Sequence, residues 1–430
     1  MKRVLIITYY WPPGGGSGVQ RWLKFSRYLP EFGWEPVIFT VDNPQYQLSD
    51  KSLESETLPG IEVHRLKAFD PNDLYNQWFS KSIGKPNVGF TSSKKESAAF
   101  RLVKWIRGNW FIPDSRVFWV GPASKRITQI LSEKRYDAII STGPPHSLHL
   151  IGKKVADATG IRWIADFRDP WTEIYYFNEM RPSHRARKKH LRLEKMVLTS
   201  ADEIVVVGET MKKMFAQHTQ KPIHVITNGY DHEDYEGHEQ IHIYNHSTFL
   251  ISHIGVMSPT QNPYSLWTAL RQLAEELPHF REKLVLKLTG EVDHGIIQHV
   301  RDSGLENHLV HTTYQPHKKA IESQIEADLL LLSINKVANS EYLLTGKLFE
   351  YLGAKRPILC IGPTKGDAAG VLSETNAGQT FHFDDVAGIK TFIKRLFLEH
   401  QTQEIQVGKG QIERFSRKNL TNSLVKILNG

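Results

Sequence analysis

The sequence has 430 residues, of which 40% are hydrophobic and 23% charged, so it excludes a largely disordered or fibrous chain and indicates at least two domains. No segment approaches the roughly 18 apolar residues of a membrane span, and the first residues lack a signal-peptide cleavage site, so we expect a cytoplasmic protein. The single cysteine, Cys360, excludes an internal disulfide bond and a cysteine-rich metal site.

The net charge of +8 suits a nucleic acid, an anionic membrane face or a phosphorylated ligand. Part of it is concentrated in residues 181–195, where Glu194 is the only acid. This segment is either a solvated helix face or a surface that rests on anionic lipid. No nucleic-acid-binding motif surrounds it, so we expect no nucleic-acid partner. Its basic residues are Arg181, Arg185, Arg187, Lys188, Lys189, Arg192 and Lys195.

Short apolar runs alternate with amphipathic segments along the first half of the chain. A helix is predicted from Val19 to Leu29, with Gly33 as its C-cap. Residues 68–122 lack strand signals, and we predict a mostly helical insertion there. Its aromatic residues are core by default, or they line an acceptor groove or touch a membrane; they include Trp78, Trp105, Trp110, Phe111 and Trp119. Strands are predicted over residues 3–8, 35–40, 136–141, 162–166, 201–207 and 222–226.

The same alternation resumes near residue 248. Helices are predicted over residues 263–276 and 345–352, and the polar stretch 231–247 is the best candidate for a connection between the halves. The pattern is that of an α/β protein with two Rossmann-like, doubly wound parallel sheets. Strands are predicted over residues 249–254, 284–289, 309–311, 327–333, 357–361 and 379–381.

A glycine-rich loop, Gly14-Gly15-Gly16-Ser17-Gly18, follows the first predicted strand and opens a helix. Such a loop lets backbone N–H groups approach an anion or a sugar phosphate, although a plain tight turn explains it as well. The dinucleotide fingerprint is incomplete, there is no P-loop lysine, and Thr40 rather than an acid closes the second strand. A nicotinamide oxidoreductase is therefore disfavoured.

Charged residues also follow the strand over residues 162–166. Asp166, Arg168 and Asp169 lie where ligands of open α/β sheets collect, and His146 follows the preceding strand toward the same edge. Two carboxylates beside a guanidinium indicate either a functional site or a clamp in which Arg168 pairs with both acids.

In the second half, Lys347 falls in the first turn of a predicted helix and Glu350 lies one turn further on. The ammonium and the free N–H groups of that turn are suited to a diphosphate, and the carboxylate to a ribose diol. The alternative is an i,i+3 surface ion pair without a functional role.

Taken in order, these motifs resemble the retaining glycosyltransferases of the GT-B class, in particular the large bacterial family 4, over nearly the whole chain. The segments that carry the resemblance are the glycine-rich loop, Ile112-Pro113-Asp114 with Trp119, residues 144–147, 166–171, 226–231, 253–255, 288–291, 314–317, 347–353 and 414–421.

The resemblance implies an acceptor-binding domain over residues 1–235, a donor-binding domain over residues 236–405 that faces it across a cleft, and a C-terminal helix over residues 406–430 that crosses back to the first domain. It further implies transfer of a sugar from a nucleotide diphosphate to a glycan or polyprenyl-linked acceptor, with retention, in polysaccharide biosynthesis of the lipopolysaccharide type. No metal ion or other cofactor is expected, and the location is cytoplasmic with peripheral contact to the inner membrane face.

By the same resemblance we assign the site residues in three groups. The catalytic group is Asp166, Arg168, Asp169 and Lys347. The acceptor-binding group is Gly14, Ser17, His146 and Trp171. The donor-binding group is Gly15, Gly16, Asn228, Gly255, Gly290, His317, Glu341, Gly346, Lys347 and Glu350.

Two departures from the family pattern stand out. The family's E-x7-E spacing leads from Glu350 back to Tyr342, with Glu341 one residue further, so either the loop is one residue longer or the first glutamate is absent. The family's Arg and Lys after the first donor-domain strand are also missing, which leaves Lys347 to carry most of the diphosphate charge. A sugar-nucleotide 2-epimerase and a degenerate, non-catalytic scaffold remain alternatives.

Overall fold

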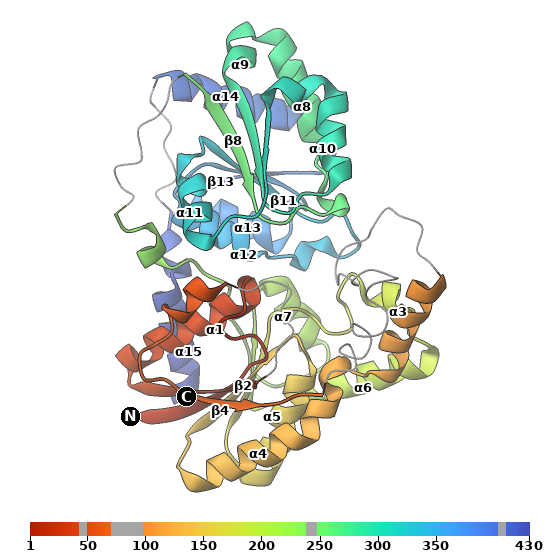
Figure 1. Cartoon of the computed structure of the whole chain (residues 1–430), viewed down its shortest axis with the longest axis vertical. Coiled ribbons are helices and arrows are strands. Elements are labelled where there is room, and N and C mark those ends of the chain that lie inside the picture. The colour runs from red at the N-terminus through yellow and green to blue at the C-terminus, as the bar shows by residue number, and fades with distance from the viewer. Residues whose placement is uncertain (43–49, 70–97, 238–246, 403–409) are drawn as a thin grey trace. The chain divides into compact units, whose positions relative to one another are not determined.

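The computed structural model of the chain describes residues 1–42, 50–69, 98–237, 247–402 and 410–430 (Figure 1). The described residues form two compact units. Unit 1 contains the chain up to Thr227 together with Arg417–Gly430, and unit 2 contains Asn228–Ser416. Each unit holds one parallel sheet with helices on both faces, so the predicted fold class of two doubly wound α/β domains is confirmed.

The sheet of unit 1 has the strand order β3-β2-β1-β4-β5-β6-β7. All six strands predicted for the first half are present. The sequence missed β3, since this half-buried strand at the sheet edge carries Glu62, His64 and Arg65 in place of an apolar run. The strands are β1 (Lys2–Ile7), β2 (Trp34–Val41), β3 (Glu62–Leu66), β4 (Ala138–Gly143), β5 (Trp163–Phe167), β6 (Glu203–Val206) and β7 (Ile223–Val225).

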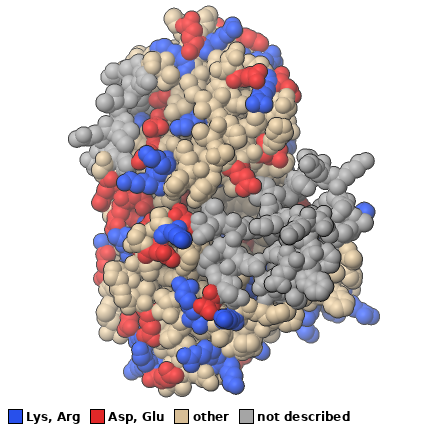
Figure 2. Space-filling view, viewed as in Figure 1, with Lys and Arg blue, Asp and Glu red and all other residues tan. Residues whose placement is uncertain are grey.

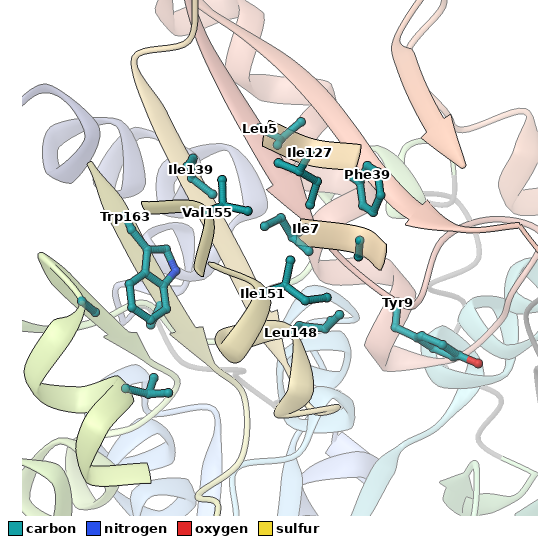
Figure 3. Packing of buried hydrophobic residues seen from close by; sticks show 14 of the residues in the cluster. Leu5, Ile7, Tyr9, Phe39, Ile127, Ile139, Leu148, Ile151, Val155 and Trp163 are labelled. Carbon is teal, nitrogen blue, oxygen red and sulfur yellow. The ribbon is translucent and has the colours of Figure 1, made fainter. Parts of the chain in front are cut away.

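Alternate residues of β1 enter two hydrophobic cores, which explains why the strand is apolar on both faces. Leu5 and Ile7 belong to a core cluster that also contains residues of α4 (Val120–Glu133), α5 (Ser147–Thr159) and α6 (His184–Ser200), and Figure 3 shows part of it. Val4 and Ile6 pack against α1 (Ser17–Tyr28) and α15 (Arg417–Asn429). The C-terminal helix α15 thus completes the first unit.

The first helix ends one residue earlier than predicted. It stops at Tyr28 and continues as a 3-10 turn, η1 (Leu29–Phe32). Gly33, with φ of 83°, caps this turn rather than the α-helix, and its amide donates to the Leu29 and Pro30 carbonyls. Helix α7 (Glu209–Ala216) follows β6 in the same unit.

The described part of the predicted insertion contains α3 (Ala98–Trp110) and η3 (Ser115–Trp119); Trp78 lies outside the described residues. Its aromatic residues divide between core and surface. Trp119 is buried and stacks on Phe39 with ring centroids 5.6 Å apart, whereas Trp105 and Trp110 are 40% and 72% exposed. The core interpretation therefore holds for Trp119 and fails for the two tryptophans of α3.

The sheet of unit 2 has the order β10-β9-β8-β11-β12-β13, and all six predicted strands are confirmed. Leu329 and Leu331 of the central strand β11 face α8, α10 and α14, while Leu330 and Leu332 face α11, α12 and α13. The strands are β8 (Phe249–Ile254), β9 (Leu284–Thr289), β10 (Leu309–Thr312), β11 (Leu329–Ser333), β12 (Ile358–Ile361) and β13 (Gly378–Phe381). The helices are α8 (Tyr264–Glu276), α9 (Pro278–Lys283), α10 (His294–Val300), α11 (His317–Glu326), α12 (Gly346–Gly353), α13 (Asp367–Thr375) and α14 (Val386–Thr402).

The start of the predicted connection over residues 231–247 belongs to unit 2. It forms the 3-10 turn η5 (His232–Tyr235). The Tyr235 hydroxyl donates to the Glu350 carbonyl at 2.6 Å and contacts Gln324 Oε1 at 3.1 Å, which ties the turn to α11 and α12. The contact division accordingly falls at residues 227/228, before the predicted boundary at 235/236. Residues 238–246 lie outside the described residues.

Candidate functional site

Asp166, at the end of β5, lies inside unit 1 with 1% of its surface exposed. It forms a two-point ion pair with Arg21 of α1, with Nη2 2.8 Å from Oδ1 and Nε 3.2 Å from Oδ2. The Trp22 indole and the Thr142 hydroxyl also donate to Oδ2, at 2.9 and 2.7 Å. Both carboxylate oxygens are therefore satisfied by the protein. The predicted clamp of Asp166 by Arg168 is wrong, because Arg21 holds this carboxylate.

Arg168 connects two loops of unit 1. Its guanidinium donates to the Gly18 carbonyl at 3.0 Å and to the Pro144 carbonyl, which joins the glycine-rich loop to the turn after β4. A Cβ on Gly18 would lie 2.9 Å from Arg168 Nη1, so a glycine suits this position. Arg168 forms no ion pair with a described residue, and its role here is to hold the loops.

Asp169 differs from its neighbours. It is half-buried and forms no hydrogen bond or ion pair with any residue that the structure describes. Burial raises the pKa of this carboxyl above its ordinary value, and the nearby Arg168 charge offsets part of that rise. Of the three predicted catalytic residues in this loop, Asp169 is the one whose carboxylate the described protein leaves available.

The glycine-rich loop leads into α1. Gly14 is buried, Gly15 is half-buried and Gly16 is exposed with φ of 88°, a backbone conformation that favours glycine. No side chain of the described residues caps the first turn of α1 at Gly16. The Ser17 side chain lies outside the described part. This loop geometry is compatible with both predicted interpretations, an anion site and a tight turn.

His146 and Trp171 were predicted to contact an acceptor, but both lie in the interior of unit 1. They are 8% and 2% exposed, and their rings stack in parallel with centroids 5.0 Å apart. The Trp171 indole donates to His190 Nδ1 of α6 at 3.0 Å, and Glu194 accepts from the backbone N–H of Trp171 at 3.3 Å. Burial lowers the pKa of His146 well below its ordinary value. These contacts correct the acceptor assignment, since α6 covers the loop that carries Trp171.

In unit 2, two predicted glycines and Lys347 come together. Gly255 follows β8 and Gly290 follows β9, with φ of 117° and 114°. A Cβ on Gly255 would lie 2.6 Å from Lys347 Cε, and a Cβ on Gly290 would lie 2.5 Å from the Gly255 carbonyl oxygen. Both positions therefore require glycine, in conformation and in space. The lysine stem lies against bare backbone at the ends of two adjacent strands.

Lys347 is half-buried near the N-terminus of α12, and its contacts in the described protein are neutral. Nζ donates to the Val256 carbonyl and lies 3.2 Å from His253 Nε2. Burial lowers the pKa of the ammonium to about 8. Lys347 forms no ion pair with Glu350 or any other described residue, so the predicted alternative of a surface ion pair is wrong.

Glu350 lies one turn further along α12 and is half-buried. Its Oε2 accepts a hydrogen bond from Gln324 Nε2 of α11 at 3.2 Å. Gln324 is buried and contacts the Tyr235 hydroxyl. The carboxylate is thus oriented by a neutral amide, and the nearby Lys347 ammonium acts on it through its charge without forming an ion pair.

The remaining donor-binding predictions lie at several places in unit 2. Gly346 opens α12, directly before Lys347, and Asn228 is the half-buried first residue of the unit. His317 opens α11, with its Nε2 3.2 Å from Asp234 Oδ2. Glu341 is exposed in η10 (Ser340–Tyr342). The structure brings together Gly255, Gly290 and Lys347, with Glu350 on the same helix, and its contacts do not connect Glu341 to this group.

Sequence reasoning missed three polar residues that organise these sites: Arg21, His253 and Gln324. Each is almost completely buried. A signal existed for two of them. Arg21 interrupts an apolar helix next to Trp22 and Leu23, and His253 lies in a strand that is otherwise mostly apolar. A basic side chain in such a place needs a partner, and the partners could not be named without the fold.

Among the described ranges, no group of three or more His, Cys, Asp or Glu side chains is arranged to hold a metal ion. In the same part of the chain, no helix combines the length and the apolar character needed to cross a membrane.

Comparison with known proteins finds a family similarity over part of the chain. Residues 88–234 match the sequence model described as Glycosyltransferase Family 4. This match, with the GT-B fold of the structures below, confirms the resemblance predicted from the sequence and supports a glycosyltransferase. No curated protein matches the chain.

Solved structures share the fold over the whole chain. Sucrose-phosphate synthase from Thermosynechococcus elongatus is 12% identical with a TM-score of 0.63, covering 100% of this chain and 98% of its own. The Anabaena protein HepE, in complex with UDP-glucose, is 14% identical with a TM-score of 0.57 and full coverage of both chains. A mutant of TarM from S. aureus, in complex with fondaparinux, α-GlcNAc-glycerol and UDP, is 11% identical with a TM-score of 0.60 and full coverage of both chains.

Proposed function

We propose that the protein is a retaining glycosyltransferase that takes its sugar from a nucleotide diphosphate bound by unit 2. One observation carries the proposal: the Lys347 ammonium lies at the start of α12, over the backbone of Gly255, and has neutral partners only among the described residues. A half-buried cation without an acidic partner is suited to an anionic ligand. Similar folds with UDP-glucose or UDP bound, in the HepE and TarM structures, support a nucleotide as the donor.

Each donor group then has a place in unit 2. Lys347 and the first N–H groups of α12 bind the diphosphate, because ammonium charge and helix dipole both favour an anion there. Gly255 and Gly290 let the backbone approach the ligand without Cβ atoms. Glu350, held by Gln324, accepts hydrogen bonds from the ribose hydroxyls. The backbone at residues 314–317, which ends at His317, receives the base.

The reaction follows from these roles. The bond between the anomeric carbon and the diphosphate oxygen breaks, and the acceptor hydroxyl oxygen forms the new bond on the same face of the sugar. The hydroxyl proton passes to the departing diphosphate oxygen, so no protein nucleophile is needed. Lys347 stabilises the negative charge that develops on the diphosphate, and we therefore expect no requirement for a metal ion. Asp169 of unit 1 is assigned to the acceptor, which is a glycan or a polyprenyl-linked saccharide of cell-surface polysaccharide biosynthesis.

We further propose that unit 1 rests on the anionic inner face of the membrane through α6. The only acid of the basic segment, Glu194, is turned inward toward Thr172, and the cations on the other faces of the helix are exposed. On the face drawn in Figure 2, basic and acidic side chains are mixed. Helix α3 joins the start of α6 through Asn109, which receives the Ser183 N–H at 2.7 Å, and α3 adds two exposed tryptophans, Trp105 and Trp110. Cations beside aromatic rings are typical of a surface that binds anionic lipid.

The donor proposal is tested by binding UDP, GDP and ADP to the purified protein by calorimetry. We expect one of them to bind, and Lys347→Ala to weaken binding and to lower turnover by about two to three orders of magnitude, the scale of losing one preorganised charge contact. Lys394→Ala, at an exposed lysine of α14, is the matched control and should change neither. Full activity of the Lys347→Ala protein, with its circular dichroism unchanged, would remove Lys347 from the mechanism.

Two other outcomes would redirect the assignment. Epimerised nucleotide sugar formed from the donor without an acceptor would favour a sugar-nucleotide 2-epimerase. A wild-type protein that binds none of the three nucleoside diphosphates would favour a non-catalytic scaffold.

Transfer that continues in EDTA would support the metal-independent mechanism, and a strict need for added Mg²⁺ or Mn²⁺ would contradict it.

The membrane proposal is tested by co-sedimentation with vesicles. We expect binding to vesicles containing phosphatidylglycerol, release at high salt, and no binding to pure phosphatidylcholine, because the attraction is electrostatic. The triple variant K188Q/K189Q/R192Q should lose binding, while K394Q/R395Q on α14 should keep it. Equal binding of both variants would show that α6 is an ordinary solvated helix.

A further inference from the structure

His253 lies in the interior of unit 2, in the middle of the sheet. It belongs to β8, which pairs with β9 on one side and β11 on the other, and none of its surface is exposed. Its Nδ1 is 3.0 Å from the carbonyl oxygen of Leu331 on β11. A carbonyl only accepts, so Nδ1 carries the proton and donates. The ring is therefore fixed as one tautomer by a backbone group of the adjacent strand.

The other ring nitrogen faces Lys347. In a neutral imidazole with a protonated Nδ1, Nε2 is an acceptor, and it lies 3.2 Å from the lysine ammonium. Burial and the neighbouring Lys347 charge lower the pKa of His253 to about 3, which agrees with a neutral ring at physiological pH. The ammonium thus donates to His253 and to the Val256 carbonyl, and its third N–H has no partner in the described protein.

The chemistry of this contact suits a lysine that must serve a ligand. A carboxylate at position 253 would fix Lys347 equally well, but it would neutralise the charge that a diphosphate needs. An apolar side chain would leave the ammonium without its acceptor in a half-buried place. A neutral imidazole fixes the direction of the ammonium and leaves the whole positive charge in place. Gly255 does the same for the lysine stem, because its missing Cβ leaves the space that Lys347 Cε occupies.

We propose that His253 is a positioning residue that aims the Lys347 ammonium at the diphosphate of the donor, which extends the proposed function to a residue buried behind the ligand. It takes no part in proton transfer and does not touch the substrate. This contact gives a physical reason why one lysine can serve where the family pattern has further cations: the cation is held in place before the ligand arrives, so less order is lost on binding.

The test compares two variants that differ in one contact. Asn at position 253 keeps an amide N–H for the Leu331 carbonyl, but its side chain is too short to reach Lys347. Gln is longer, and its amide oxygen can replace Nε2 as the acceptor. Calorimetry with UDP, and with GDP or ADP if UDP does not bind, is done for wild type, His253→Asn and His253→Gln, and again for each in the Lys347→Ala background. The matching nucleoside is titrated as a second probe.

We expect His253→Asn to weaken binding of the nucleoside diphosphate about tenfold, the scale of losing one hydrogen bond to a charged group, and to leave nucleoside binding unchanged. His253→Gln should restore affinity to within about threefold of wild type. In the Lys347→Ala background neither change at position 253 should matter, because residues that act through one contact are not additive.

Three results would overturn the inference. They are unchanged diphosphate affinity in folded His253→Asn, an equal loss for the nucleoside and its diphosphate, and a further tenfold loss when the change is added to Lys347→Ala. If wild type binds a nucleoside diphosphate but these patterns appear, only the role of His253 fails. If wild type binds none, the proposed function fails as well.

Discussion

The charged residues near the strand ends have opposite kinds of partners in unit 1 and in unit 2. In unit 1, Asp166 is enclosed and meets a full ion pair with Arg21, together with two neutral donors. In unit 2, Lys347 is half-buried and meets a carbonyl and a neutral imidazole. Both residues were predicted to be catalytic, Asp166 at the end of a strand and Lys347 in the first turn of a helix.

The difference shows which charge the fold uses and which it leaves for a ligand. An enclosed charge must be paired inside the protein, because its desolvation costs several kcal/mol or more. A charge held by neutral groups keeps its field, and an anion from outside can complete the pair. By this criterion Asp166 stabilises unit 1, and Lys347 serves binding.

The largest effect is expected for Asp166→Ala. The change leaves the Arg21 guanidinium buried without its counter-ion, which typically destabilises a protein by about 3–5 kcal/mol. Urea unfolding followed by circular dichroism measures the loss. Asp169→Asn is the control in the same loop and should cost less than about 1 kcal/mol, because Asp169 has no partner among the described residues. A folded Asp166→Ala protein with wild-type stability and reduced activity would reverse the comparison and make Asp166 the functional residue.

A smaller effect is expected for Gly255→Ala. The backbone at φ of 117° disfavours any residue with a Cβ, at a cost of about 1–3 kcal/mol, and the new methyl group would displace Lys347 Cε. We therefore expect both a lower melting temperature and weaker binding of the nucleoside diphosphate. Gly370→Ala in α13 is the control, since a Cβ there meets nothing within 4 Å and alanine favours a helix. Unchanged diphosphate affinity in Gly255→Ala would separate Gly255 from the binding site.

Glu350→Gln sharpens the assignment within unit 2. Replacing a charged acceptor by a neutral one weakens each ribose hydrogen bond, and we expect nucleoside diphosphate affinity to fall about five- to tenfold. The decisive measurement compares the ribonucleotide with its 2′-deoxy form. Wild type should prefer the ribonucleotide, and the variant should lose most of that preference. A preference equal to that of wild type would place the ribose elsewhere, whereas Glu399→Gln on α14 should leave all values unchanged.

The fold could be predicted largely from the sequence, because parallel strands between two helix layers must be apolar on both faces. The runs at residues 3–8 and 327–333 show this plainly. Strand β3 escaped because an edge strand with one half-buried face does not need such a run. The approach of Lys347 to Gly255 was not predicted, because it joins a helix to the end of a strand more than 90 residues earlier in the chain.

The partners of buried polar groups could not be predicted in this way. Asp166 pairs with a residue 145 positions away along the chain, whereas the only partner that the sequence offered was Arg168, two residues away, as one of two alternatives. His146 and Trp171 looked available because they follow strands, and only the position of α6 shows that they are covered. Which neighbour satisfies a buried charge depends on the tertiary packing, which a single sequence does not show.

The smallest expected effect is a pH dependence of the stability of unit 2. The pKa of Lys347 is lowered from its ordinary 10.5 to about 8, so the folded protein loses this proton at a pH where the unfolded chain still keeps it. Between about pH 8 and 10.5 the unfolded state therefore binds more protons, and the free energy of unfolding should rise with pH from this group. Solvent around the half-buried ammonium keeps that rise well below the full limit of about 1.4 kcal/mol per pH unit.

Binding of the nucleoside diphosphate should change in the opposite direction. The ligand needs the charged ammonium, so its affinity should fall as pH rises through about 8, by at most about tenfold per unit, with uptake of a proton on binding. His253, with a pKa of about 3, stays neutral across this range. Calorimetry in buffers of different ionisation enthalpy counts the protons, and Lys347→Ala should abolish the uptake. If Lys347 serves ligand binding, the free energy of unfolding and the ligand affinity should change with pH in opposite directions, and both changes should be lost in Lys347→Ala. If both change in the same direction, Lys347 stabilises the fold, as Arg21 does.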